Sequence, residues 1–252
     1  MIPAEARAEL ALNARQDIVV AGMGVAAQVF RRRVPECRVE LRVTDGDRVK
    51  AGAAMGRVEG PARGLLTVER TALNFLQHLS GIATLTAQYA ERIAGTRAVL
   101  IDTRKTTPGL RALEKHAACV GGARNHRLRL DDGVLIKDNH ISVCGSITAA
   151  VTRARGGVPV LTKIEVECDT LEQVKEALQA GADMILLDNM SVEDMRRAVA
   201  LSGGRTPLEA SGGVRLDTIR AIAETGVDFI SVGRITQSAP AVDIGLDAVI
   251  KA

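Results

Sequence analysis

The sequence has few aromatic residues: its 252 residues include no tryptophan, one tyrosine and three phenylalanines. Proteins that bind single-stranded nucleic acid stack the bases on such side chains. The formal net charge of +3 is also too small to indicate DNA binding. We therefore expect no nucleic-acid partner and a core made of aliphatic side chains.

Long apolar runs and paired cysteines are absent as well. No stretch approaches the run of about 18 apolar residues that crosses a membrane, and no leader of basic, apolar and small residues opens the chain. We expect neither a membrane span nor a signal peptide. The four scattered cysteines form no C-x-x-C pair, which predicts reduced thiols in a cytoplasmic protein and no metal site built on them.

Residues 1–97 predict a first domain. Residues 39–43 alternate between apolar and polar side chains, which predicts a strand, and Asp45-Gly46-Asp47 predicts a hairpin-type turn after it. The spacing D-G-x-x-V-x-x-G also occurs in lipoyl-carrier folds. No lysine stands where the tip of such a hairpin would be, so the structural interpretation is favoured over a carrier role.

A helical segment closes this first domain. Between residues 69 and 94, leucine and isoleucine recur every three positions, which predicts one or two helices with an apolar face. Ser80-Gly81 is the expected break between them. Arg70 stands at the start of the segment, where position alone predicts an exposed helix residue.

The pattern changes from Ala98 onward to six repeats of apolar strand, polar strand end and helix. The strand ends are Arg104, Lys137, Glu167, Asp188, Ser211 and Gly233. Such repeats predict an α/β fold in which residues 98–252 form a parallel, TIM-like barrel, with the site at the carboxyl ends of the strands. An open doubly wound sheet is the alternative, but no G-x-G-x-x-G follows the first strand.

Positive charge is concentrated in residues 104–137. This segment has eight lysines or arginines and only three acids, Glu114, Asp131 and Asp132. The segment is interrupted by T-T-P-G and G-G, which places its charges on loops at strand ends. Guanidinium and ammonium groups there predict a small ligand with several phosphate or carboxylate groups. The alternative is an ordinary solvated surface.

The acidic strand ends predict a different role. Glu167 and Asp188 could hold a divalent cation and sugar hydroxyls, or stabilise a positively charged sugar in a transition state. Structural ion pairs are the alternative. Glu165 lies two residues before Glu167 and should point the same way, so the choice between the two glutamates stays open.

Glycines mark the last two strand ends. Ser211-Gly212-Gly213 and Gly233 predict backbone N–H groups that bind phosphate, with plain tight turns as the alternative. His126 and His140 lie in or beside the basic segment, but no H-x-x-x-H accompanies them, and so zinc is not expected.

Several long motifs resemble those of one family. E-R-T-A-L-N-F-L-Q-H-L-S-G-I-A-T, D-T-R-K-T-T-P-G-L-R-A-L-E-K, G-G-A-R-N-H-R-L and L-I-K-D-N-H-I occur in the order found in quinolinate phosphoribosyltransferase, the decarboxylating enzyme of NAD synthesis. K-I-E-V-E, L-L-D-N, S-G-G and S-V-G extend the resemblance over nearly the whole chain.

The resemblance implies a pentosyltransferase with an N-terminal α/β sandwich domain and an incomplete α/β barrel. Its substrates would be quinolinate and phosphoribosyl pyrophosphate (PRPP), with Mg²⁺ as cofactor. The products would be nicotinate mononucleotide, pyrophosphate and CO₂. A homodimer, or a larger assembly, is implied as well, and the last residues of the chain could pack on the N-terminal domain.

The resemblance also implies a role for each matching residue. Residues that would hold the quinolinate carboxylates are Arg104, His126, Arg127 and Lys137, joined by Arg70 from the neighbouring subunit. Lys105 would lie between the two substrates, and Thr103 would contact substrate beside it. Glu167 and Asp188 would bind the ribose and the metal. Ser211, Gly212, Gly213 and Gly233 would bind the 5-phosphate.

Three features differ from the family pattern. The usual helical segment with a G-D-x-T motif would precede the point where this sequence begins. Arg129 stands where glycine is usual, and Gln237 stands where histidine is common. Two other functions are therefore kept as alternatives: a related enzyme with a different substrate, and a phosphosugar-binding protein without catalysis.

Overall fold

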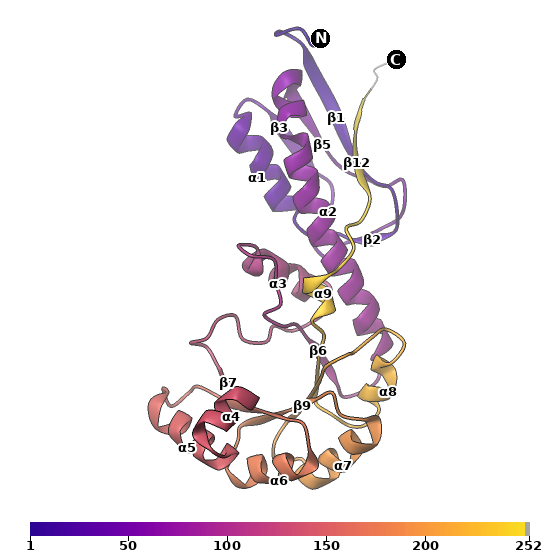
Figure 1. Cartoon of the computed structure of the whole chain (residues 1–252). Helices are drawn as coiled ribbons and strands as arrows, with labels where there is room; N and C mark the ends of the chain where they lie inside the picture. The colour runs from indigo at the N-terminus through magenta and orange to yellow at the C-terminus, as the bar shows by residue number, and fades with distance from the viewer. Residues whose placement is uncertain (250–252) are drawn as a thin grey trace. The chain divides into compact units, whose positions relative to one another are not determined.

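The computed structural model describes residues 1–249, and their contacts form two compact units (Figure 1). The first unit contains Met1–Ala87, Thr107–Gly122 and the chain from Arg234 onward. The second unit contains Gln88–Thr106 and Ala123–Gly233. This division differs from the expected boundary between residues 97 and 98, because residues 88–97 belong to the second unit and Thr107–Gly122 belongs to the first. Within the described residues, every helix is too short or too polar to span a lipid bilayer.

An antiparallel sheet forms the first unit. Its strands lie in the order β12 (Ile244–Ala248), β1 (Arg7–Ala14), β5 (Ala54–Pro61) and β3 (Arg38–Leu41). The strand predicted near residues 39–43 is confirmed as β3. The turn predicted at Asp45-Gly46-Asp47 is present, with Gly46 at a φ of 101°, but it does not join paired strands, because β4 (Arg48–Val49) pairs with β2 (Ile18–Val19) instead of β3.

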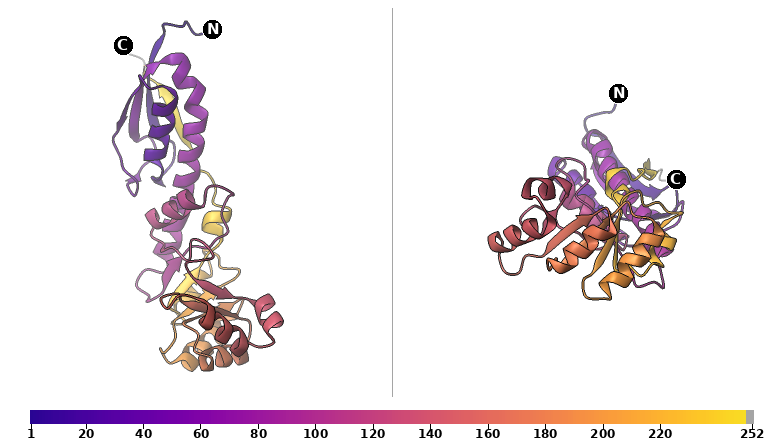
Figure 2. Two further views of the ribbon diagram at one scale, coloured as in Figure 1. Left: turned by 90° about the vertical axis from the view of Figure 1, so that its left-hand side faces the viewer. Right: turned by 60° about the horizontal axis from the view of Figure 1, so that its bottom comes forward.

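Helices α1 (Met23–Arg33) and α2 (Ala62–Arg92) cover one face of this sheet (Figures 1 and 2). Their apolar faces join the inward residues of the strands in one core, in which Met55, Leu65 and Leu76 are completely buried. Removing a large aliphatic side chain from water stabilises the fold by about 1.5–3 kcal/mol. The expected aliphatic core is therefore present.

The break expected in the second helix is absent, because α2 runs through Ser80 and Gly81 without interruption. The hydroxyl of Ser80 accepts from the N–H of Ala21 at 3.0 Å and donates to the carbonyl of the same residue at 3.1 Å. At Gly81, a Cβ atom would collide with the carbonyl oxygen of Pro240. Both residues therefore serve packing within the first unit.

Two shorter helices, α3 (Arg111–Val120) and α9 (Arg234–Gln237), also belong to the first unit. Glu114 of α3 is fully buried. One carboxylate oxygen contacts Nε2 of His78 at 2.8 Å, and the other accepts from the N–H of Thr107 at 3.0 Å. This carboxylate holds the turn before α3 against α2.

The second unit is built on a parallel sheet. Its strands are β6 (Val99–Ile101), β7 (Val134–Ile136), β8 (Ile164–Cys168), β9 (Met184–Asp188), β10 (Leu208–Ser211) and β11 (Phe229–Ser231). All six predicted strands are confirmed, and their order is β6-β11-β10-β9-β8-β7. In the described residues β6 and β7 do not pair with each other, which fits the expected incomplete barrel. The third strand, whose apolar run V-L-T-K-I-E-V-E was expected to extend from Val160 to Glu167, begins only at Ile164, and Val160 and Leu161 lie in an exposed turn.

Helices connect these strands and lie on the outer side of the sheet (Figure 2). They are α4 (Asp138–Cys144), α5 (Ile147–Gly157), α6 (Leu171–Gln179), α7 (Val192–Ser202) and α8 (Ile219–Ala223). The hydroxyls of Ser146, Thr170 and Ser191 cap α5, α6 and α7 by accepting from backbone N–H groups of the first turn. These connections leave the carboxyl ends of the strands open to carry functional side chains.

Candidate active site

Except for Arg70, His126 and Arg127, the predicted site residues lie at the carboxyl ends of the parallel strands in the second unit. Thr103, Arg104 and Lys105 follow β6, and Lys137 follows β7. Residues that end or follow the other strands are Glu167, Asp188, Ser211, Gly212, Gly213 and Gly233, while His126 and Arg127 lie in the segment between α3 and β7. Arg70 lies in α2 of the first unit, where its side chain is exposed.

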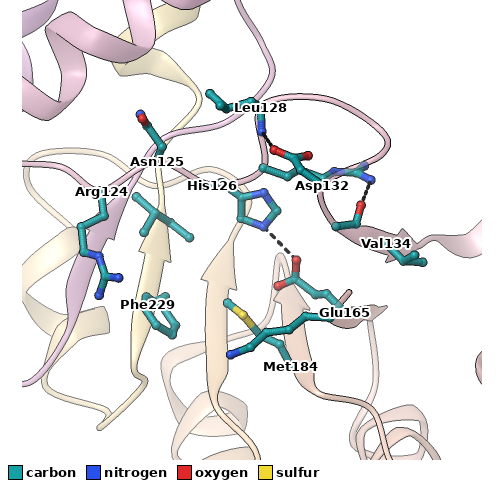
Figure 3. A pocket seen from close by; sticks show the side chains of 13 residues that line it. Arg124, Asn125, His126, Leu128, Asp132, Val134, Glu165, Met184 and Phe229 are labelled. Atoms are coloured by element: carbon teal, nitrogen blue, oxygen red, sulfur yellow. Dashed lines mark hydrogen bonds and ion pairs between the residues drawn. The ribbon is translucent and has the colours of Figure 1, made fainter. Parts of the chain in front are cut away.

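His126 lies in the wall of a cavity of about 450 Å³ in the second unit (Figure 3). Figure 3 shows its imidazole ring and the carboxylate of Glu165 pointing toward each other. Nε2 of His126 is 2.8 Å from Oε2 of Glu165 and 3.5 Å from Oε2 of Glu209. Both carboxyl groups therefore lie beside the same ring nitrogen of His126.

Asp102 holds the segment that carries His126. Its buried carboxylate accepts from the N–H of His126 at 2.8 Å and from Nδ2 of Asn125 at 2.6 Å. The N–H of Asp102 in turn donates to the carbonyl of Arg124. These bonds attach the start of the loop to the end of β6, so that Asp102 positions His126 without being a predicted site residue.

Arg104 and Arg127 form the most positive part of the site. Burial, followed by the nearby cation of Arg104, lowers the pKa of Arg127 from its ordinary value. Arg127 donates to the carbonyl of Gly133 at 3.0 Å, and Nε of Arg104 is buried without a hydrogen-bond partner. Two neighbouring cations with unused donors form a site suited to an anionic ligand.

Lys137 and Glu167 form an ion pair across neighbouring strands β7 and β8. Glu167 is only partly buried, whereas Glu165, two residues earlier on the same face of β8, is 4% exposed and contacts His126. The two glutamates thus point the same way, as expected, but have different partners. Only Glu167 lies next to a basic strand end.

Asp188 and Ser211 are cross-strand partners at the ends of β9 and β10. Oδ2 of Asp188 accepts from Nδ2 of Asn189 at 2.7 Å, and Asn189 itself has a positive φ of 52°. A Cβ atom at Gly212 would collide with the side-chain oxygen of Asn189. Glycine is therefore required there, because the two strand-end turns pack directly against each other.

Besides Asp102, sequence reasoning missed two further buried residues of the site. Glu209 is 1% exposed and Ser231 is 4% exposed. Burial, followed by the charge of Glu165, raises the pKa of Glu209 well above its ordinary value. Only a partial signal was available: each residue lies two positions before a predicted phosphate-binding residue, Ser211 or Gly233, and so shares its face of the sheet, but other inward strand residues do the same.

Comparison with known proteins decides the family. The profile described as "Quinolinate phosphoribosyl transferase, N-terminal domain" matches residues 1–80, and the corresponding C-terminal domain matches residues 82–247. The chain belongs to the quinolinate phosphoribosyl transferase family. This family membership confirms the resemblance found in the motifs.

Individual members of the family are similar over nearly the whole chain. Nicotinate-nucleotide pyrophosphorylase (carboxylating) of Mycobacterium leprae is 46% identical over 238 residues, which are 92% of this chain and 84% of that protein. The chloroplastic enzyme of the same name from Arabidopsis thaliana is 42% identical to this chain. The matched region is 97% of this chain and 75% of the Arabidopsis protein. The crystal structure of nicotinate-nucleotide pyrophosphorylase from Ehrlichia chaffeensis has a TM-score of 0.95 and 44% identity, over 99% of this chain and 90% of that one.

The two substitutions noted in the sequence lie in different units. Arg129 is exposed and pairs with Asp131 at 3.1 Å, in the loop that carries His126. Gln237 is the exposed last residue of α9 in the first unit. Neither substitution changes a residue to which a chemical role was assigned.

Proposed function

We propose that this quinolinate phosphoribosyl transferase family member transfers the phosphoribosyl group of PRPP to the ring nitrogen of quinolinate. Loss of CO₂ then gives nicotinate mononucleotide, and pyrophosphate is the other product. Family membership over both domains supports this reaction. The observation that carries the proposal is a pair of neighbouring guanidinium groups: that of Arg104, which follows β6 and has a buried and unpartnered nitrogen, and that of Arg127.

The basic residues would bind the dicarboxylate. Arg104, Arg127 and Lys137 present charged donors at or beside the strand ends, and His126 lies on the cavity wall beside Arg127. A carboxylate placed between Arg104 and Arg127 would satisfy the free nitrogen and reduce the repulsion of the two cations. Lys105, with Thr103 two residues before it, would lie between quinolinate and the sugar.

The acidic and glycine-rich strand ends would bind PRPP. Gly212 and Gly213 both have positive φ and follow Ser211, an arrangement that suits binding of the 5-phosphate together with Gly233. Glu167 and Asp188 offer carboxylate oxygens, the ligands that Mg²⁺ prefers. The donor set therefore fits the proposed Mg²⁺, which would neutralise pyrophosphate charge. Lys137 would have to release Glu167 when this ion binds.

These residues would promote the reaction by positioning the two substrates and by stabilising the charges that develop on them. The carboxylates of Glu167 and Asp188 favour the positive charge that develops on the ribose as pyrophosphate leaves. The cations around quinolinate hold its ring nitrogen toward the ribose carbon from which pyrophosphate leaves. After transfer the ring nitrogen is cationic, and this charge stabilises the carbanion that remains when CO₂ leaves. No covalent intermediate with the protein is needed.

A homodimer, or a larger assembly, is part of the proposal. Arg70 lies in the first unit with its side chain exposed, apart in sequence from every other residue assigned to substrate. We propose that it reaches the site of a neighbouring subunit. The proposed location is the cytoplasm, which is supported by the four cysteines being free thiols.

The test of the proposed function is turnover by the purified protein. Quinolinate, PRPP and Mg²⁺ should give equal amounts of nicotinate mononucleotide and CO₂, and nicotinate in place of quinolinate should give no product. The variant Lys105→Ala should lower kcat about 10²- to 10³-fold, the effect of removing one electrostatic stabiliser. Lys175→Ala, an exposed lysine on α6, is the matched control and should keep full activity. Binding of both substrates without product would favour the non-catalytic alternative.

A further inference from the structure

We propose that Asn189 is a positioning residue of the site. Its side-chain amide connects the carboxylate of Asp188 to the backbone turn at Gly212, so that the two are held ready to bind the sugar and the phosphate of one ligand. The proposal rests on the proposed function for the assignment of ribose to Asp188 and of the 5-phosphate to the turn. All three residues lie in the second unit.

The backbone of Asn189 is the first observation. Among the residues that the structure describes, Asn189 is the only one other than glycine with a positive φ, 52°. Asparagine tolerates this conformation, but only glycine adopts it without strain. Its N–H donates to the carbonyl of Ser211 at 3.0 Å, which brings the turn after β9 against the turn after β10. The side chain is exposed, so its contacts rather than burial in a core account for it.

One end of the amide contacts Asp188. Nδ2 of Asn189 donates to Oδ2 of Asp188 at 2.7 Å. An ionised carboxylate only accepts hydrogen bonds, so the nitrogen of the amide must face it and the amide oxygen must point elsewhere. The bond restricts rotation of the carboxylate, and it therefore determines how the other oxygen of Asp188 is presented at the end of β9.

The other end of the amide contacts the turn that is proposed to bind phosphate. A Cβ atom added to Gly212 would lie 2.2 Å from Oδ1 of Asn189 and 2.9 Å from its backbone nitrogen. The same addition at Gly213 would meet Oδ1 only at 4.0 Å. The amide oxygen therefore packs against the backbone of Gly212 itself. One planar group thus touches both the carboxylate and the turn.

These contacts predict that loss of the side chain affects the sugar more than the phosphate. The bond from the N–H of Asn189 to Ser211 belongs to the backbone, so the turn should persist without the amide. The carboxylate of Asp188, in contrast, would rotate more freely, and binding of ribose would have to order it. Ordering one side chain on binding lowers affinity by about 3- to 10-fold.

The experiment compares two ligands that share a phosphate and differ in the sugar. Ribose 5-phosphate and methyl phosphate are each titrated without Mg²⁺ into the wild type and into Asn189→Gly, and ³¹P NMR measures the dissociation constants. Glycine adopts the backbone conformation of residue 189 and removes only the amide. We expect the wild type to prefer ribose 5-phosphate. In Asn189→Gly this preference should fall about 3- to 10-fold, while methyl phosphate should bind within about twofold of the wild type.

Two further variants separate positioning from general damage. Asn189→Ala should lose the same preference and should also melt about 2–4 °C below Asn189→Gly, because alanine is strained at a positive φ. Asn139→Gly is the matched control. Asn139 is also an exposed asparagine that follows an aspartate beyond a strand end, in α4, and it has no assigned contact with substrate. That variant should keep the wild-type preference.

Several outcomes would overturn the role of Asn189. These are a preference in Asn189→Gly equal to that of the wild type, an equal weakening of both ligands, and a wild type that binds neither ligand or does not distinguish them. Turnover of quinolinate and PRPP with Mg²⁺ is measured on the same samples. An inactive protein whose preference depends on Asn189 overturns only the proposed function, and an active protein whose preference does not overturns only the role of Asn189.

Discussion

At the scale of single residues, the site depends on buried side chains that act through their neighbours. Asp102 illustrates this, since its carboxylate accepts from the N–H of His126 and from the side chain of Asn125. The segment that contains both residues has little regular secondary structure. One carboxylate therefore replaces the backbone bonds that a strand or helix would have supplied.

Replacing Asp102 with alanine should weaken both folding and quinolinate binding. The N–H of His126 would lose its acceptor, which costs about 1–3 kcal/mol of unfolding free energy. The KM for quinolinate should rise more than kcat falls, because His126 would lose its position. Urea denaturation and steady-state kinetics measure these effects. Asp131→Ala removes an exposed carboxylate of the same loop and should change stability by less than about 0.5 kcal/mol.

Cys168 predicts a pH dependence of stability. Burial raises the pKa of this thiol to about 12, with a smaller contribution from the charge of Asp169. In an unfolded chain a cysteine has a pKa of about 8.5, so the folded state binds the proton more tightly. The corresponding stability is fully present below pH 8.5 and is lost as the pH rises toward 12, by about 1.4 kcal/mol per unit at most.

Urea denaturation at pH 8, 9 and 10 measures this loss. Other groups also titrate in that range, and Cys168→Ala serves as the control because it removes only the thiol. The free energy of unfolding of the wild type should fall more steeply with pH than that of the variant. Parallel slopes would show that the thiol does not contribute.

Sequence reasoning found the residues at the strand ends and missed those behind them. Arg104, Lys137 and Asp188 could be predicted because a charged residue directly after an apolar run is conspicuous. Glu209 and Ser231 could not be distinguished from inward strand residues. Their importance depends on side chains from other strands, and register between distant strands is not visible in one sequence.

At the scale of elements, α2 shows how packing overrides a local signal. Ser80-Gly81 has the composition of a helix break, yet the helix continues through it. The reason is the close approach of the chain at Pro240, which is far away in sequence. Local sequence also misplaced the start of the third predicted strand. Val160 and Leu161 are apolar and look like strand residues, yet both are exposed.

Gly81→Ala should therefore destabilise the protein, although alanine is the better helix former. Its Cβ would force apart α2 and the backbone at Pro240, and such overpacking typically costs about 1–3 kcal/mol. Gly24→Ala in α1 is the matched control, since a Cβ there meets no atom within 4 Å. That variant should be neutral or up to about 1 kcal/mol more stable. Thermal denaturation of both proteins distinguishes a packing effect from helix propensity.

At the scale of the whole molecule, the proposed dimer makes a prediction about mixed subunits. Arg70→Ala and Lys105→Ala should each lose most of their activity alone if both residues contact substrate. If Arg70 acts on the neighbouring subunit, a mixed dimer has one site with both native residues. After subunit exchange, an equal mixture should recover about a quarter of the wild-type activity, because half of the dimers are mixed and each has one complete site.

Absence of recovery in a mixture shown to contain mixed dimers would place Arg70 in the site of its own subunit. The control mixes Lys105→Ala with Lys137→Ala, two residues of the same unit, and should recover no activity. Sedimentation velocity establishes the size of the assembly in each case.

The pairing of β12 with β1 has a consequence for synthesis on the ribosome. β1 and its partner β12 are separated in sequence by the whole second unit. One edge of β1 is therefore unpaired on the ribosome until β12 emerges, while the strands of the second unit emerge and can form their own sheet. An open strand edge invites pairing with other chains. The nascent protein should for this reason depend on chaperones until release, and a circular permutant that joins the two strands in a hairpin should lose that dependence.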